Sequence, residues 1–143
     1  MRHALILPSV LLCACASAGK PAPDTAKALP PAANALGPQT LEPGECGLFG
    51  WDVSSTPRFI FFATPARGLV KLGDDTLSLP PAADFPAPDG RYGPVQLQLG
   101  AGEPLEQGRR YPAARMKVVQ DDGFTRTVPM AVVETCGPVD SPL

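Results

Sequence analysis

The fold is decided by Arg-Met-Lys-Val-Val-Gln (115–120), Asp-Asp-Gly (121–123) and Phe-Thr-Arg-Thr-Val-Pro-Met-Ala-Val-Val-Glu-Thr-Cys (124–136). An Asp-Gly pair between two β-forming runs is a strong hairpin signal, because both residues tolerate a positive φ. Alternation places four apolar side chains on one face of the second strand: Phe124, Val128, Met130 and Val132. Pro129 falls on the other face and has no amide proton, which predicts an edge or a bulge there.

Upstream of this hairpin, short β-forming segments alternate with turns. Residues 46–52 and 58–64 are dense in apolar and aromatic side chains, with Ser54–Pro57 between them, and predict a hairpin that is buried on both faces. Residues 69–72 and 76–79 flank Gly73-Asp74-Asp75 and predict a second hairpin.

Residues 94–99 form a further strand with one solvated face, because Val95, Leu97 and Leu99 alternate with glutamines. Two Pro/Gly-rich stretches, 80–93 and 100–114, are predicted as long loops, which are common places for binding residues. We therefore expect an all-β domain over residues 45–143, a small antiparallel sandwich or barrel of about seven strands.

Composition limits the class of protein. The chain has 143 residues, enough for one domain, with 12 Lys and Arg against 14 Asp and Glu. This balance argues against a nucleic-acid partner, which requires a concentrated basic surface. The 19 prolines and 14 glycines disfavour a helical bundle.

The N-terminal residues indicate export. Residues 4–12 form an apolar run that is too short to span a bilayer but suits the core of a signal peptide. The following Leu12-Cys13-Ala14-Cys15 resembles the lipobox of bacterial lipoproteins. The resemblance implies a signal peptide over residues 1–14, cleavage before Cys15 and lipidation of that cysteine. Ala16 follows in place of Asp, which implies the outer membrane rather than the inner membrane.

Two alternatives remain open for this region. Ala16-Ser17-Ala18 fits the ordinary signal peptidase, with cleavage before Gly19, and would give a soluble periplasmic or secreted protein. Residues 15–44 are rich in Pro and Ala and lack aromatic residues, so we expect a disordered tether. In the alternative, residues 36–41 add an edge strand to the domain.

Only two cysteines, Cys46 and Cys136, lie within the predicted domain. Export exposes them to an oxidising compartment, so we expect a disulfide between them that closes the domain. A redox or metal role is disfavoured because there is no Cys-x-x-Cys spacing and no histidine partner.

Little in the chain suggests catalysis. The only histidine is His3, inside the signal peptide, so neither Ser-His catalysis nor His-ligated zinc is expected in the mature chain. The paired carboxylates at 74–75 and 121–122 are interpreted as solvated turn residues, although glycan hydrolysis also uses paired carboxylates. Calcium binding at 121–123 would lack the further spaced ligands of known loops. We therefore expect no metal and no cofactor.

Binding residues are suggested at two places. Arg109, Arg110 and Tyr111 lie in the second predicted loop, and Arg and Tyr are frequent at binding hot spots, although a solvated loop is the favoured explanation. Trp51 is interpreted as a core residue, with sugar stacking on an exposed ring as the alternative.

The combination of Glu45–Trp51, Arg58–Phe62 and a last strand ending at 132–136 resembles small exported proteobacterial proteins of unassigned function, over residues 41–137. The architecture is also similar to that of membrane-bound lysozyme inhibitors. The leading hypothesis is a non-enzymatic envelope lipoprotein that binds or scaffolds a periplasmic protein while anchored to the membrane. The alternatives are an inhibitor of a cell-wall hydrolase or protease and, last, a carboxylate-dependent enzyme acting on glycans.

Overall fold

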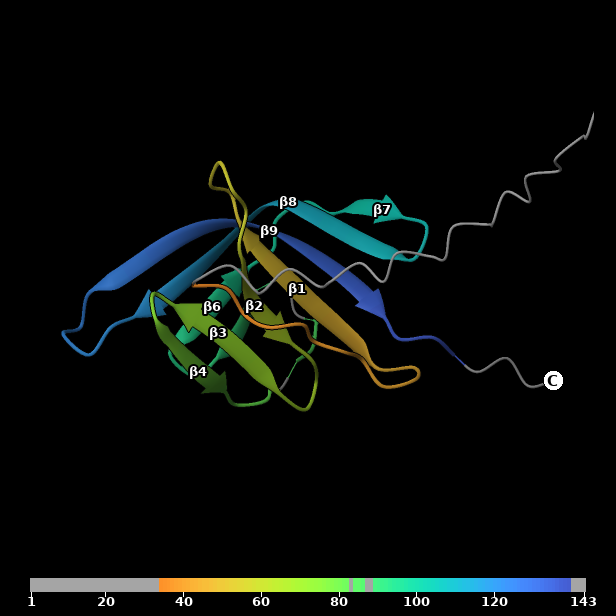
Figure 1. Cartoon of the computed structure of the whole chain (residues 1–143), viewed down its shortest axis with the longest axis horizontal. Coiled ribbons are helices and arrows are strands. Elements are labelled where there is room, and N and C mark those ends of the chain that lie inside the picture. Colours follow the sequence, from red (N-terminus) through yellow and green to blue (C-terminus); the bar gives the residue numbers. More distant parts are fainter. Residues whose placement is uncertain (1–33, 83, 87–88, 140–143) are drawn as a thin grey trace, which may run out of the picture.

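The computed structural model describes residues 34–82, 84–86 and 89–139, and Figure 1 shows their arrangement. The predicted signal peptide and Cys15 lie outside these ranges. The described residues form nine β-strands and no helix. The strands are β1 (Cys46–Asp52), β2 (Phe59–Ala63), β3 (Gly68–Leu72), β4 (Asp75–Leu79), β5 (Asp89–Tyr92), β6 (Val95–Gln98), β7 (Glu103–Leu105), β8 (Gly108–Val119) and β9 (Thr125–Cys136).

All strands belong to one antiparallel sheet with the order β4-β3-β2-β1-β9-β8-β6-β5, and β7 pairs with the start of β8. The sheet curls into a nearly closed barrel, with β4 and β5 as its two ends (Figure 1). The predicted all-β antiparallel barrel is therefore confirmed. The order also follows from local connections, since most strands pair with a neighbour in sequence.

The hairpin predicted at 115–136 is formed by β8 and β9. Its turn has Gly123 at a φ of 82°, and the amide of Gly123 donates to the carbonyl of Gln120 over 2.9 Å. Val128, Met130 and Val132 pack in or against the core, as the alternation predicts. Phe124 does not join them, because β9 begins one residue later and the hairpin tip extends beyond the core, which leaves Phe124 72% exposed.

Pro129 occupies the edge position expected for it. It pairs with Arg115 of β8, but β1 pairs with β9 only from Met130 to Cys136. Residues 125–129 therefore have one side without a strand partner, and a missing amide proton is tolerated there. A register irregularity in β8 between Tyr111 and Ala114 lies close to the same point.

The core fills the barrel with apolar side chains from most of the strands. A bulge in β2 places Ile60 as an extra residue between the partners of Gly50 and Trp51, so that Ile60 and Phe61 both reach the core. Gly50 makes room for the side chain of Met130, because a Cβ atom at Gly50 would overlap it. The predicted hairpin of β1 and β2 is thus buried near its centre on both faces.

Each of the two predicted long loops contains a strand, and the second is mostly strand, which corrects the sequence interpretation and raises the strand number above seven. The first contains β5, which pairs with β6 through a turn in which Gly93 has a φ of 59°. The second contains β7 and the beginning of β8. Strands β5 and β7 are short and rich in polar residues, Gly or Pro, so their composition is similar to that of loops.

The disulfide joins Cys46 and Cys136, which are direct partners across β1 and β9. It ties the first residue of β1 to the last residue of β9 and so closes a loop with a sequence separation of 90 residues. This is the predicted pairing.

Residues 34–44, assigned from the sequence to the end of the linker, lie against the domain. Leu36 is buried, and its amide donates to the carbonyl of Phe59 over 2.7 Å. Arg67 donates to the carbonyl of Thr40 over 2.8 Å. No strand forms at 36–41, but this segment is part of the packed structure.

Candidate functional site

The largest hollow that we describe on the barrel is a groove of about 580 Å³ between β4 and the end of the β8–β9 hairpin. We call it the β4 groove. Its apolar lining is Leu72, Leu77, Pro94, Val118 and Val119, and its charged lining is Asp75, Asp121, Asp122 and Arg126.

One wall of the β4 groove is the inward face of β4. The register with β3 pairs Leu77 with Val70, which is fully buried, so Leu77 points to the core side of the sheet. Leu79 shares that face and is buried, whereas Leu77 is 41% exposed. The face becomes uncovered toward Asp75 because β4 is the last strand of the sheet and has no strand partner on its far side among the described residues.

The other wall is the part of the β8–β9 hairpin that extends past β6. The pairing of β6 with β8 ends at Val118, and beyond it β8 pairs only with β9. Val119 is 53% exposed there, and Phe124 stands at the tip of the same hairpin. The tip is held by the amide of Phe124, which donates to a carboxylate oxygen of Asp122 over 3.0 Å.

The charge of the β4 groove is mainly negative, with three carboxylates against the guanidinium of Arg126. Asp75, Asp121 and Asp122 are exposed, so each is available to a charged partner. The groove therefore offers an apolar floor between carboxylates, on a strand that can still form backbone hydrogen bonds.

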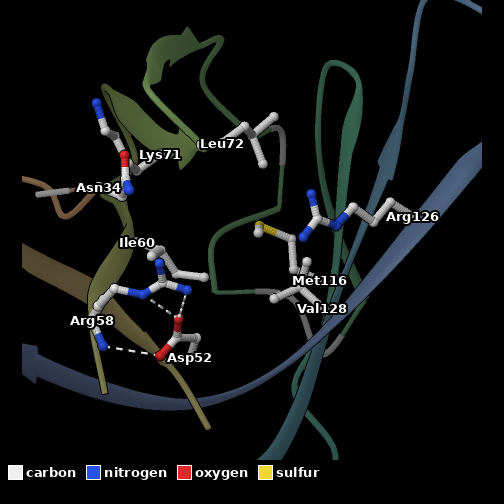
Figure 2. A pocket seen from close by; sticks show the side chains of 10 residues that line it. Asn34, Asp52, Arg58, Ile60, Lys71, Leu72, Met116, Arg126 and Val128 are labelled. Carbon is white, nitrogen blue, oxygen red and sulfur yellow. Dashed lines mark hydrogen bonds and ion pairs between the residues drawn. The ribbon is translucent and has the colours of Figure 1, made fainter. Parts of the chain in front are cut away.

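A smaller cavity of about 60 Å³ adjoins the β4 groove at the end of the barrel and shares Leu72, Gly73 and Arg126 with it (Figure 2). Figure 2 shows Arg58 and Asp52 directed toward each other on one side and Arg126 beside Met116 and Val128 on the other. This cavity is too small for a ligand much larger than a few water molecules.

Asp52 supplies the carboxylate in the lining of this cavity. It is 7% exposed and accepts hydrogen bonds from the amide of Arg58 (3.0 Å), from the guanidinium of Arg58 (2.6 and 2.8 Å) and from the hydroxyl of Ser54 (2.8 Å). Burial raises the pKa of Asp52, but the hydrogen bonds and the charge of Arg58 together lower it further, and the net shift is downward. The arrangement fixes the connection between β1 and β2 and leaves no lone pair aimed at a ligand.

The residues predicted for binding do not gather on one surface. Arg109, Arg110 and Tyr111 lie in β8 rather than in a loop, so neighbouring side chains point to opposite faces. The hydroxyl of Tyr111 donates to the carboxylate of Glu134 over 2.7 Å. Burial raises the pKa of Tyr111 to about 12, with further upward contributions from Glu134 and a downward one from the charge of Arg109. Tyr111 thus joins β8 to β9.

Trp51 belongs to an aromatic cluster on the outer side of the sheet. Its ring centroid lies 5.3 Å from that of Phe59, which lies 6.0 Å from that of Phe49. Phe62 continues the cluster at 5.1 Å from Phe49. Trp51 is partly buried in these contacts rather than placed in the barrel core.

The paired carboxylates occupy hairpin ends, as interpreted from the sequence, although Asp75 is the first residue of β4. All four of them are exposed. A glycosidase pair requires one carboxyl group that burial keeps protonated, and exposure does not supply that condition. Within the described ranges, no group of three or more His, Cys, Asp or Glu residues is placed to hold a metal ion.

Comparison with known protein families, with curated proteins and with solved structures finds no match to this chain. In the part of the chain that the structure describes, no helix is long and apolar enough to cross a membrane.

The sequence interpretation missed Leu77, Val119 and Phe124 as candidate binding residues. Leu77 and Phe124 alternate with other apolar residues and so look like core positions, and only the strand order shows that no strand of the described part covers them. The one sequence signal of a binding surface was the adjacent pair Asp121-Asp122 beside an aromatic residue in a turn.

Proposed function

We propose that this protein is a non-enzymatic binding module of the bacterial cell envelope, anchored through lipid on Cys15, and that it binds a protein partner in the β4 groove. The observation that carries the proposal is the gathering of exposed apolar side chains at this groove. Leu77 and Val119 line the groove, and Phe124 lies at the tip of the adjacent β8–β9 hairpin. Together they are three of the six large hydrophobic residues that are exposed in the described chain. Gathered exposed apolar surface marks interaction sites, whereas single exposed residues do not.

Export and anchoring are supported by the residues that precede the domain. The apolar run 4–12 followed by Leu12-Cys13-Ala14-Cys15 has the form of a lipoprotein signal. The disulfide between Cys46 and Cys136 agrees with an oxidising compartment. Two or more acyl chains would give stable attachment, which one chain does not.

Photo-crosslinking in intact cells tests the binding proposal. A photoreactive phenylalanine analogue replaces Val119 in the full-length chain, and a matched variant carries it at Leu105. The two residues are similarly exposed, at 53% and 45%, and Leu105 lies on β7 at the opposite end of β8. We expect a discrete adduct with an envelope protein from position 119 and none from position 105. The same adducts from both positions, or none from either, would overturn the proposal.

The intact mass of the protein purified from membranes tests the anchor. A mass that fits cleavage before Cys15 plus acyl chains supports the anchor. An unmodified chain that begins at Gly19 would contradict the anchor and identify ordinary secretion.

A further inference from the structure

We infer that the β4 groove takes the partner as an added strand, an extended segment that runs along β4 with apolar residues facing the groove and Lys or Arg residues near its carboxylates. This inference rests on the proposed function, since it names the chemistry of the segment that the same groove binds.

The backbone of β4 is prepared for such an addition. β4 pairs with β3 in five consecutive register pairs without a bulge, and no described strand pairs with its other side. A strand edge of this kind presents unpaired N–H and C=O groups, which natural proteins usually block with Lys, Pro or a bulge. The sequence Asp-Thr-Leu-Ser-Leu of β4 contains no Lys, Pro or bulge, and its one charged residue, Asp75, lies at the end of the strand. By comparison, the edge strand β7 has only three residues and includes Pro104.

The side chains of the groove define what the added strand must carry. Leu77 faces the core side of β4 but is 41% exposed, and Pro94 and Val118 line the groove with it. A strand laid beside β4 would place alternate side chains over this apolar floor. An apolar residue there would bury Leu77 in the manner in which the next residue of that face, Leu79, is already buried.

Charge complementarity selects the remaining side chains. Asp75 lies at one end of β4, and Asp121 and Asp122 lie on the opposite wall, against the single cation Arg126 in the lining. These exposed carboxylates favour Lys or Arg in a partner and disfavour Asp or Glu. Because they are exposed, they contribute more to the choice of partner than to the affinity, and salt should weaken that choice.

Other occupants fit the β4 groove less well. A second copy of this chain would present its own β4, which contains no Lys or Arg and so would leave the carboxylates of the groove without a cationic partner. An anionic lipid surface would meet the same three carboxylates. A basic, extended protein segment meets neither obstacle.

Synthetic peptides provide the test, with the mature full-length protein as the receptor. The probe is a fluorescent nine-residue peptide with alternate valines in its centre and lysines at both ends, and its partner peptide has glutamate in place of each lysine. Two further Lys peptides carry backbone N-methyl groups on alternate residues, one on the odd set and one on the even set. An added strand donates hydrogen bonds to β4 from only one of these sets.

Fluorescence anisotropy at low salt should show that the Lys peptide binds about tenfold or more tightly than the Glu peptide. N-methylation of one set should weaken binding by about tenfold and N-methylation of the other set should leave it nearly unchanged. Leu77→Lys should abolish binding, and Val119→Lys should weaken it. Leu105→Lys, at a similarly exposed position on β7, should leave it unchanged.

The two proposals fail differently. No binding of the Lys peptide, equal binding of the Lys and Glu peptides, or equal effects of both N-methylated sets would overturn strand addition, while an adduct from position 119 in cells would keep the proposed function. The free protein could also form a dimer that the Leu77→Lys substitution dissociates. That result would assign the groove to a second copy of the chain and would overturn the inference.

Discussion

Replacing Asp52 with asparagine should lower the free energy of unfolding by about 2 kcal/mol at pH 7. Asparagine keeps the oxygen that accepts from Ser54 and from the amide of Arg58, at 2.8 and 3.0 Å. Asparagine has no negative charge. Its amide nitrogen replaces the oxygen that accepts from the guanidinium of Arg58 at 2.6 and 2.8 Å. A hydrogen bond to a charged group contributes roughly 1.5–3 kcal/mol, but the side chain of Arg58 is 42% exposed, so the pair is worth less than two full bonds.

The stability difference between the wild-type protein and Asp52→Asn should become smaller at acidic pH. The folded protein holds the pKa of Asp52 below its ordinary value of 3.8 because the hydrogen bonds outweigh burial. The unfolded chain therefore takes up the proton first as the pH falls. The contribution of Asp52 is fully present above pH 3.8 and is lost as the pH falls through the lower pKa of the folded state. The difference between the wild-type protein and the variant should shrink accordingly.

Urea unfolding followed by the fluorescence of Trp51, at pH 7 and at pH 3, measures both effects. Asp121→Asn is the matched control, since Asp121 is exposed at the hairpin tip, and it should change stability by less than about 0.5 kcal/mol. If Asp52→Asn were as stable as the control at pH 7, or lost the same stability at both pH values, the account of this carboxylate would be refuted.

Three further predictions concern the disulfide and the two tyrosines. Replacing Cys46 and Cys136 together with serine should lower the free energy of unfolding by roughly 4–5 kcal/mol in the chain-entropy model, given a sequence separation of 90 residues. A loss below about 1 kcal/mol in denaturant titrations would contradict that model here. Absorbance at alkaline pH should show no tyrosine ionisation near pH 10, because burial is the main cause that raises the pKa of both Tyr92 and Tyr111 to about 12. Stability should then fall as the pH rises from 10 toward 12, since the unfolded chain loses these protons first, and a normal titration step would show that the rings are not buried. Tyr92→Phe should leave stability unchanged or raise it by about 1 kcal/mol, because the buried hydroxyl of Tyr92 has no hydrogen-bond partner among the described residues. A clear loss of stability would indicate that this hydroxyl is bonded in solution.

The parts of the fold that the sequence predicted are those that depend on neighbouring residues. The β8–β9 hairpin could be predicted because Asp-Gly requires a turn and the alternation on both sides agrees with it. The disulfide could be predicted because the N-terminal residues indicate export and the two cysteines of the expected domain leave one intramolecular pairing. β5 and β7 were missed because four and three residues, with Gly or Pro among them, are too few to show alternation.

The place of the candidate binding residues in the fold was missed for a different reason. Arg109, Arg110 and Tyr111 were grouped by their type and by an expected loop, but in a strand the middle one points away from the other two. Residue type alone does not indicate the direction in which a side chain points. Once the segment is a strand, Tyr111 becomes a contact between β8 and β9 through Glu134.

The β4 groove could not be predicted from any single segment, because its exposure is a property of the sheet order. Alternation assigns Leu77 and Leu79 to the same inward face, and both assignments are correct. Whether an inward residue is buried depends on what lies beyond the strand. Within residues 34–82, 84–86 and 89–139, β4 has no strand partner on that side, and the hairpin of β8 and β9 lies opposite. A barrel that fails to close beside one strand therefore exposes a core-type side chain next to a free backbone edge. These are the two features that an extended partner needs, so the recognition proposed here follows from incomplete closure rather than from a dedicated binding loop.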